Sequence, residues 1–205
     1  MSDVLITLPP HDRVLALFEE FGVVRPRDLE ARGLSRSILR RLLNEGLVTR
    51  VGRGLYTLAA EEADEHRALL EAARRVPHGI VCLVSALRLH GLTTQQPYQV
   101  WLALSHSARQ PKVDHPPLRV VRMSGAAWTN GREESRVGGV AVPVFGIAKT
   151  VADCFKFRSK VGLDVALEAL REVLADRRAT IDELWDMARV CRVTRVMHPY
   201  LESLA

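Results

Sequence analysis

The sequence predicts an α+β protein built from two parts, and the order of its elements supports this prediction. The first sixty residues have the pattern of short helices followed by two strands, whereas the remainder has strands first and then a run of helices. A chain of 205 residues has room for one or two domains. We therefore predict an N-terminal helical domain at residues 1–60, a linker helix at 61–76 and a mixed α+β domain at 77–205.

Apolar spacing predicts the first two helices. Residues 12–21 carry apolar side chains at helical spacing, and Gly22, a residue common after helix C-termini, follows them. Pro26 lies early in a second short helix, residues 27–32, which Gly33 ends.

A third helix is predicted to begin at Ser35, which suits an N-cap, and to end at Gly46. Its apolar side chains are Ile38, Leu39, Leu42 and Leu43. Helical geometry places a polar set on the opposite face. This set consists of Arg36, Ser37, Arg40, Arg41 and Asn44.

Two segments rich in strand-forming residues, 47–51 and 55–58, follow this helix and are joined by Gly52, Arg53 and Gly54. The pattern predicts a β-hairpin. A hairpin directly after a helix-turn-helix is a wing, so we predict a winged helix-turn-helix domain that binds duplex DNA. The alternative is a packing module with a solvated arginine face. The predicted DNA-binding residues are Arg25, Arg27, Ser35, Arg36, Ser37, Arg40, Arg41, Asn44, Arg50 and Arg53.

The distribution of charge also indicates two functional surfaces. Residues 25–58 hold eight arginines against three acidic residues, and residues 76–160 hold eleven basic residues against four acidic ones. The segment between them, 61–75, is acidic. Arginine favours contacts to phosphates and base edges, so the N-terminal cluster agrees with a DNA-binding role.

Composition excludes several protein classes. Hydrophobic residues make up 47% of the chain and charged residues 26%, values typical of a folded globular protein. No apolar run approaches the roughly 20 residues that span a bilayer, and the N-terminus lacks the pattern of a secretory signal. The cysteines Cys82, Cys154 and Cys191 stand far apart, which excludes a disulfide scaffold and fits a reducing compartment. We expect a cytoplasmic protein with no membrane partner.

The remaining elements alternate strands and loops before the helices begin. An apolar run at 80–92 contains a short helix that Ser85 is predicted to cap and Gly91 to end. The other predicted elements are a strand at 98–104, a loop at 105–117, a strand at 118–123, a hairpin at 135–144 around Gly138 and Gly139, and helices at 148–155, 163–175, about 180–190 with a capping box at Thr180 and Glu183, and from there toward Leu204.

No cluster of residues with catalytic spacing is present in the sequence. Phosphate-binding loops, nucleophile elbows and zinc-protease motifs are absent. His90 near a helix end is expected to be structural. His106, Asp114 and His115 lie in a loop without the pattern of a metal site. We predict no enzyme activity, no cofactor and no metal.

An ordered set of motifs resembles the AbiEi antitoxin family. The winged module is followed by Ser-Ala-Leu-x-x-His-Gly-Leu at 85–92, Val-Trp-Leu-Ala at 100–103, the Gly-Val-x-Val-Pro-Val hairpin, Ala-Lys-Thr-Val-Ala-Asp-Cys at 148–154, and Gly-Leu-Asp-Val-Ala-Leu-Glu-Ala-Leu at 162–170. The match runs over nearly the whole chain in the right order.

The resemblance implies an antitoxin of a type IV toxin–antitoxin system that acts in abortive infection. Its winged helix would repress its own operon, and its C-terminal domain would counteract a co-encoded toxin resembling nucleotidyltransferases. The family's Lys-Thr-x-x-Asp pattern falls on Lys149, Thr150 and Asp153. Lys149 and Asp153 would share a helix face, free to form an ion pair or to contact a partner.

Two further points stay open. Arg109 and Lys112, in the basic loop at 105–117, join the three motif residues as a candidate partner surface. The alternative function is a stand-alone winged-helix regulator whose C-terminal domain dimerises or senses a ligand. Because a single winged helix buries limited surface, we expect self-association on operator DNA.

Overall fold

The computed structural model describes residues 9–52, 54–59, 67–95, 97–137 and 140–204. They form two compact units. The N-terminal unit comprises Met1–Arg75 and Arg136–Ala141, and the C-terminal unit comprises Val76–Ser135 and Val142–Ala205. Helices and sheets occur together, which confirms the predicted mixed α+β class and the helical character of the N-terminal region.

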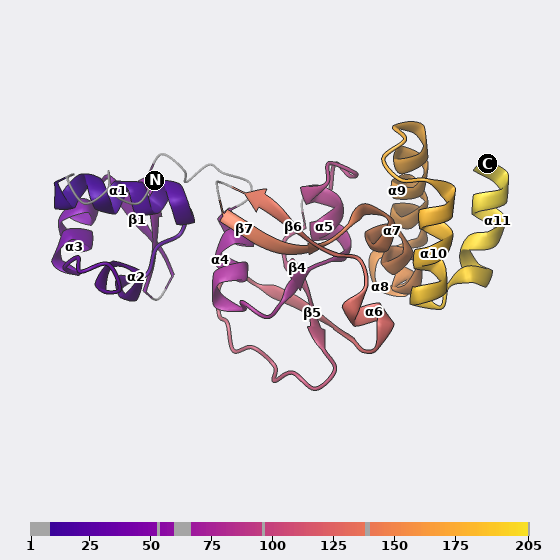
Figure 1. Ribbon diagram of the computed structural model, residues 1–205, viewed down its shortest axis with the longest axis horizontal. Coiled ribbons are helices and arrows are strands. Elements are labelled where there is room, and N and C mark those ends of the chain that lie inside the picture. The colour runs from indigo at the N-terminus through magenta and orange to yellow at the C-terminus, as the bar shows by residue number, and fades with distance from the viewer. Residues whose placement is uncertain (1–8, 53, 60–66, 96, 138–139, 205) are drawn as a thin grey trace. The chain divides into compact units, whose positions relative to one another are not determined.

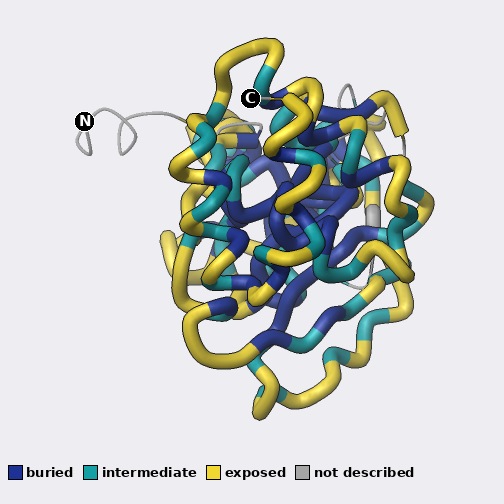
Figure 2. The backbone as a smooth tube through the Cα atoms, turned by 90° about the vertical axis from the view of Figure 1, so that its right-hand side faces the viewer, coloured by how far each residue is buried: buried dark blue, intermediate teal, exposed yellow. Residues whose placement is uncertain are grey.

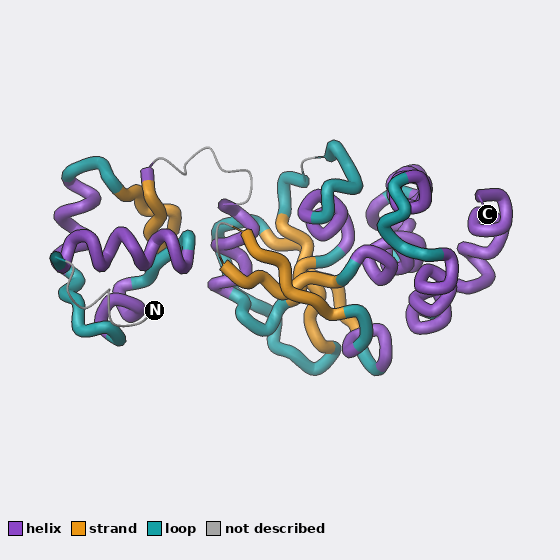
Figure 3. The backbone as a smooth tube through the Cα atoms, turned by 45° about the horizontal axis from the view of Figure 1, so that its top comes forward, coloured by secondary structure: helices purple, strands orange, loops and turns teal. Residues whose placement is uncertain are grey.

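The N-terminal unit contains three short helices followed by two antiparallel strands, as Figure 3 shows in purple and orange. Leucine, valine and phenylalanine side chains on the inner faces of these elements form its core. The elements are α1 (Pro10–Phe21), α2 (Pro26–Glu30), α3 (Ser37–Asn44), β1 (Val48–Gly52) and β2 (Leu55–Leu58), and α4 (Arg67–Arg75) also belongs to this unit.

The boundaries of α3 differ slightly from the sequence prediction. The helix begins at Ser37, and its N-cap is Arg36 rather than Ser35. The Ser35 hydroxyl still serves the helix start, because its Oγ accepts a hydrogen bond of 3.3 Å from the main-chain N–H of Ser37. Leu39 and Leu42 are buried, so the apolar face of α3 anchors the helix to the core as predicted.

A five-stranded sheet forms the base of the C-terminal unit (Figure 1). The order is β5-β4-β3-β7-β6; β3 pairs antiparallel with β4 and parallel with β7, and β4 pairs parallel with β5. The sequence prediction missed β3, since two residues of strand inside an apolar run leave no alternating pattern. The strands are β3 (Ile80–Val81), β4 (Val100–Ser105), β5 (Leu118–Met123), β6 (Arg132–Val137) and β7 (Val140–Phe145).

The helices of the C-terminal unit pack together beside this sheet. Figure 2, which faces the C-terminal helices, shows buried turns alternating with exposed ones, as amphipathic helices require. The predicted helix at 163–175 is observed with those bounds, and the predicted capping box joins Thr180 and Glu183. The helices are α5 (Leu83–Leu89), α6 (Ala126–Thr129), α7 (Ile147–Lys156), α8 (Arg158–Val161), α9 (Leu163–Ala175), α10 (Ile181–Cys191) and α11 (Thr194–Leu204).

Ser85 does not cap α5, contrary to the sequence prediction. The N-cap position belongs to Cys82, and Ser85 lies one turn further along, buried. Its Oγ accepts a hydrogen bond of 3.0 Å from the main-chain N–H of Trp101 in β4. The hydroxyl therefore ties the helix to the sheet instead of satisfying the helix start.

All three cysteines are buried free thiols in the C-terminal unit. Burial raises the pKa of the Cys82 and Cys154 thiols well above the ordinary value, and it raises the pKa of Cys191 to about 12. These thiols are therefore protonated and unreactive at neutral pH while the unit is folded. Over the described part of the chain, helices are too short or too polar to cross a bilayer.

Candidate nucleic-acid interface

The outer face of α3 is a continuous polar surface. Every member of the polar set predicted for this helix is exposed, while Leu39 and Leu42 on the opposite face are 2% and 0% exposed. Leu43 and Leu47 are 38% and 44% exposed and border this face. We call the exposed set Arg36, Ser37, Arg40, Arg41 and Asn44 the α3 face.

Carboxylates hold two of the three arginines on the α3 face. Arg36 Nε donates to the carboxylate of Glu30, and this hydrogen bond raises the pKa of Arg36 and lowers that of Glu30. Arg41 Nε donates to Glu45 Oε1 at 2.8 Å, one helical turn away. Arg40 makes no hydrogen bond or ion pair with any residue that the structure describes. A phosphate would meet Arg40 without displacing a carboxylate.

The sequence interpretation overlooked these two carboxylates. The spacing of Arg41 and Glu45, four residues apart on one helix, is a signal that could have identified the second pair. Glu30 and Arg36 belong to different helices, and their spacing carries no such signal.

Arg25, one of the predicted DNA-binding residues, is hydrogen-bonded within the N-terminal unit. It is half-buried, and its guanidinium donates to the main-chain carbonyl of Arg74 in α4. Burial lowers the pKa of Arg25, with the neighbouring positive charge of Arg27 as a second cause. Arg74 in turn forms an ion pair with Asp28. Arg25 is thus engaged inside the N-terminal unit, whereas Arg27 is exposed.

The strand pair after α3 places one further predicted residue. Arg50 is exposed on β1, opposite Tyr56 of β2, and the pairing shifts register between Arg50 and Gly52. Gly54 adopts a φ of +69°, a conformation that glycine tolerates at a turn. Arg53 lies outside the described residues.

In the C-terminal unit, a single arginine organises the basic loop after β4. The Arg122 guanidinium, on β5, donates to the main-chain carbonyls of Ser105 and Ala108 and to Gln110 Oε1. Within the loop that these bonds hold, Arg109 and Lys112 are exposed, as expected for a candidate partner surface.

The structure does not place Lys149, Thr150 and Asp153 on a surface, so this part of the predicted partner surface is wrong. They are 1%, 0% and 0% exposed, because α7 is buried at every residue from Lys149 to Phe155. The Thr150 hydroxyl donates to the main-chain carbonyl of Phe145 at 2.9 Å. Lys149 and Asp153 form the predicted i, i+4 pair, as a buried ion pair.

Several neighbouring side chains surround this ion pair and leave it almost without solvent exposure. The Lys149 ammonium lies 4.0 Å from the centroid of the Phe145 ring, and the Cys191 thiol donates to Asp153 Oδ1 at 3.2 Å. Burial raises the pKa of Asp153, and the Lys149 ammonium partly opposes that shift. Gly131 makes room for the lysine stem, since a Cβ there would lie 2.6 Å from the Lys149 Cβ. An ion pair buried to this extent supports the fold.

Two expectations about histidines concern the C-terminal unit. His90 Nε2 lies 2.7 Å from the main-chain oxygen of Phe145, a contact suited to a structural role. Within the described ranges, no group of three or more histidine, cysteine or acidic residues has the arrangement of a metal site.

Comparison with known proteins relates these elements to a family. Residues 12–59, which span α1 to β2, match the family model described as transcriptional regulator, AbiEi antitoxin. A search of curated proteins finds no match. Among solved structures, the chain is similar to the RV2827C protein from Mycobacterium tuberculosis, with 19% identity and a TM-score of 0.58 over 88% of this chain and 71% of that one. At that identity the likeness shows a shared fold alone. The family match confirms, over residues 12–59, the resemblance to the AbiEi antitoxin family of transcriptional regulators that the sequence indicated.

Proposed function

We propose that this chain is a transcriptional repressor of its own operon and the antitoxin of a type IV toxin–antitoxin system. Residues 1–60 act as a winged helix-turn-helix domain, with α3 in the major groove and the β1–β2 pair as the wing beside it. Residues 77–205 counteract a co-encoded toxin that resembles nucleotidyltransferases. The observation that carries the DNA-binding part is the α3 face, an arginine-rich surface on a helix anchored by buried leucines.

The charges of the α3 face indicate how binding would proceed. Arg40 is available to a phosphate or a base edge at once, whereas Arg41 must leave Glu45 and Arg36 must leave Glu30. Those carboxylates compete with the phosphates of DNA for the same guanidinium groups. Substitution of Arg40 should therefore weaken binding most, and removal of a competing carboxylate should strengthen it.

A gel-shift titration with DNA from the chain's own promoter tests this proposal. We expect Arg40→Gln to raise the Kd about five- to 150-fold, since one specific contact contributes about 1–3 kcal/mol. Arg171→Gln, a matched change on the exposed face of α9, should leave the Kd unchanged. Glu45→Gln should lower the Kd. Equal affinities for the wild type and Arg40→Gln would refute the proposed interface.

The proposed wing, the β1–β2 pair, leads to a separate prediction about DNA binding. Arg50→Ala should weaken binding to all sequences alike and reduce the dependence of affinity on salt concentration, because the side chain would contact phosphates. A change in sequence preference at an unaltered salt slope would contradict the assignment.

Sedimentation of the chain with operator DNA should show two copies on one duplex, and a strict 1:1 complex would count against self-association.

The antitoxin part is tested by growth. A strain that expresses the neighbouring toxin gene should grow when the full chain is present, and the Arg40→Gln variant should restore growth equally, because that substitution lies outside residues 77–205. If the chain binds its promoter but restores no growth, it is a stand-alone regulator.

A further inference from the structure

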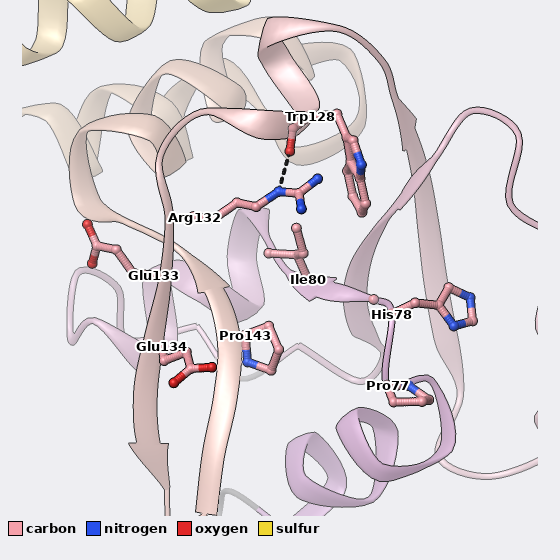
Figure 4. Close-up of a pocket in the computed structure, with 9 residues that line it drawn as sticks. Pro77, His78, Ile80, Trp128, Arg132, Glu133, Glu134 and Pro143 are labelled. Carbon is pink, nitrogen blue, oxygen red and sulfur yellow. Dashed lines mark hydrogen bonds between the residues drawn. The ribbon is translucent and has the colours of Figure 1, made fainter.

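The C-terminal unit contains a pocket of about 560 Å³ that the proposed function does not use (Figure 4). Its volume lies within the range of small-molecule sites. Ile80 of β3 and Pro143 of β7 supply apolar lining, and two side chains of β6, Arg132 and Glu134, flank them. These residues come from three adjacent strands, because β3, β7 and β6 are neighbours in the sheet.

The guanidinium of Arg132 is held in place at the pocket. Its Nε donates to the main-chain oxygen of Trp128 at 2.6 Å, and its Cζ lies 4.2 Å from the centroid of the Trp128 ring. Figure 4 shows the guanidinium beside the indole and above Ile80. The two η nitrogens make no hydrogen bond to any residue in the described part of the chain. They form a rigid fork of donors that faces a pair of acceptors on a ligand.

Glu134, which lines the same pocket, supplies an acceptor where Arg132 supplies donors. Residues two apart on a strand share a face, with their Cα atoms about 7 Å apart, so Arg132 and Glu134 project from the same face of β6. Figure 4 shows the guanidinium near Trp128 and the carboxylate near Pro143. The Glu134 carboxylate has no hydrogen-bond or ion-pair partner among the described residues, and an ionised carboxylate can only accept. Glu133 points away from both side chains in Figure 4.

We propose that this pocket binds a guanine mononucleotide. Guanine presents two acceptors, O6 and N7, on one edge and two donors, the N1–H and the 2-amino group, on the adjoining edge. Arg132 matches the first edge and Glu134 the second, while Ile80 and Pro143 cover the flat face of the base. Adenine carries one acceptor and one amino group on the corresponding edges and satisfies neither side chain fully.

The ribose and phosphate of the nucleotide would lie on the open side of the pocket. His78 lies at the margin, exposed, and makes no hydrogen bond, ion pair or ring contact with another described residue. Its imidazole is placed to donate to a phosphate oxygen. A free nucleotide therefore fits the polar groups at both ends of the pocket.

Isothermal titration calorimetry with the full chain tests the proposal, using the 5′-monophosphates of guanosine, inosine and adenosine as probes. Guanosine monophosphate should bind at least tenfold more tightly than adenosine monophosphate. Inosine monophosphate, which lacks the 2-amino group, should bind with intermediate affinity. Binding that does not saturate at millimolar guanosine monophosphate, or equal affinity for all three, would overturn the proposal.

Substitutions at exposed positions identify the groups responsible. Glu134→Gln should weaken binding of guanosine monophosphate about ten- to a hundredfold and abolish its advantage over inosine monophosphate. Arg132→Lys, which keeps the charge and removes the fork, should weaken binding of both. Glu172→Gln on the exposed face of α9 is the matched control and should change nothing. An unaltered preference in Glu134→Gln would refute the assignment of the donor edge.

Two further binding measurements distinguish this inference from RNA binding and from the proposed DNA binding. A short guanine-containing oligoribonucleotide that binds more tightly than the mononucleotide would overturn the assignment to a free nucleotide. Arg40→Gln should bind guanosine monophosphate as the wild type does, because α3 belongs to the other unit. A chain that binds the nucleotide but not its promoter therefore leaves this inference standing. A chain that binds its promoter but not the nucleotide would overturn this inference and leave the DNA-binding proposal intact.

Discussion

Replacing Lys149 by methionine should destabilise the C-terminal unit severely, because it leaves the Asp153 carboxylate buried without its counter-charge. Methionine fills most of the volume of the lysine stem, so the loss is chiefly electrostatic. Lys149 and Asp153 are 1% and 0% exposed, which leaves little water to screen either charge. Removing one partner of a buried ion pair typically costs about 3–5 kcal/mol. That is a large share of the roughly 5–15 kcal/mol that stabilises a domain.

The cost should also depend on pH, in a direction that the buried carboxyl sets. In the folded wild type the pKa of Asp153 is raised above its ordinary value of 3.8, first by burial, so its ionisation disfavours folding. The stability that this group contributes is present at acid pH and is lost as pH rises through its folded pKa. Without Lys149 that pKa rises further. The loss in Lys149→Met should therefore be larger at pH 8 than at pH 5.

Urea unfolding followed by tryptophan fluorescence measures both effects. All three tryptophans, Trp101, Trp128 and Trp185, lie in the C-terminal unit and report on it alone. Asp186→Asn, which breaks an ion pair exposed at 60% and 66%, is the matched control and should cost no more than about 1 kcal/mol. If Lys149→Met cost as little as this control, or cost the same at both pH values, the account of the buried pair would fail.

The remaining predictions concern local contacts and use the same unfolding assay. Gly131→Ala should cost more than Gly125→Ala, because both glycines have positive φ but only at Gly131 would the new methyl meet another side chain, that of the buried lysine; equal losses would exclude the steric cause. Ser85→Ala should cost about 1–3 kcal/mol by leaving the buried N–H of Trp101 without an acceptor, and a neutral result would show that another acceptor replaces the hydroxyl. Thr180→Ala should cost about 1 kcal/mol by removing the cap of α10, and an unchanged midpoint would mean that the capping box contributes nothing.

Local patterns predicted the fold where each element is amphipathic and bounded by a turn or capping residue. The helix at 163–175 has apolar residues at regular spacing, and Thr180 with Glu183 sets the start of α10. The two residues of β3 escaped prediction because a strand so short is defined by its neighbours β4 and β7 rather than by its own sequence. Ser85 was misassigned for a similar reason, since its partner lies in a strand that is distant in sequence.

The residues of the candidate site differ in the same way in how far the sequence predicted them. The exposed α3 face followed from helical periodicity alone, because its charged and apolar residues fall on opposite sides of one helix. The position of Lys149 and Asp153 did not, because charged residues are ordinarily solvated and their burial depends on packing by other elements. The apolar neighbours of this pair were the sequence signal of a buried helix; they are Val151, Ala152, Cys154 and Phe155.

The buried thiols of the C-terminal unit provide a natural probe of how often that unit opens. A maleimide reagent needs a thiolate within reach, and Cys82, Cys154 and Cys191 offer none while their surroundings remain closed. The rate at which label accumulates on the native protein therefore counts opening events of that unit, without any introduced probe. Adding a nucleotide or a partner that holds the unit shut would slow the labelling and reveal binding directly.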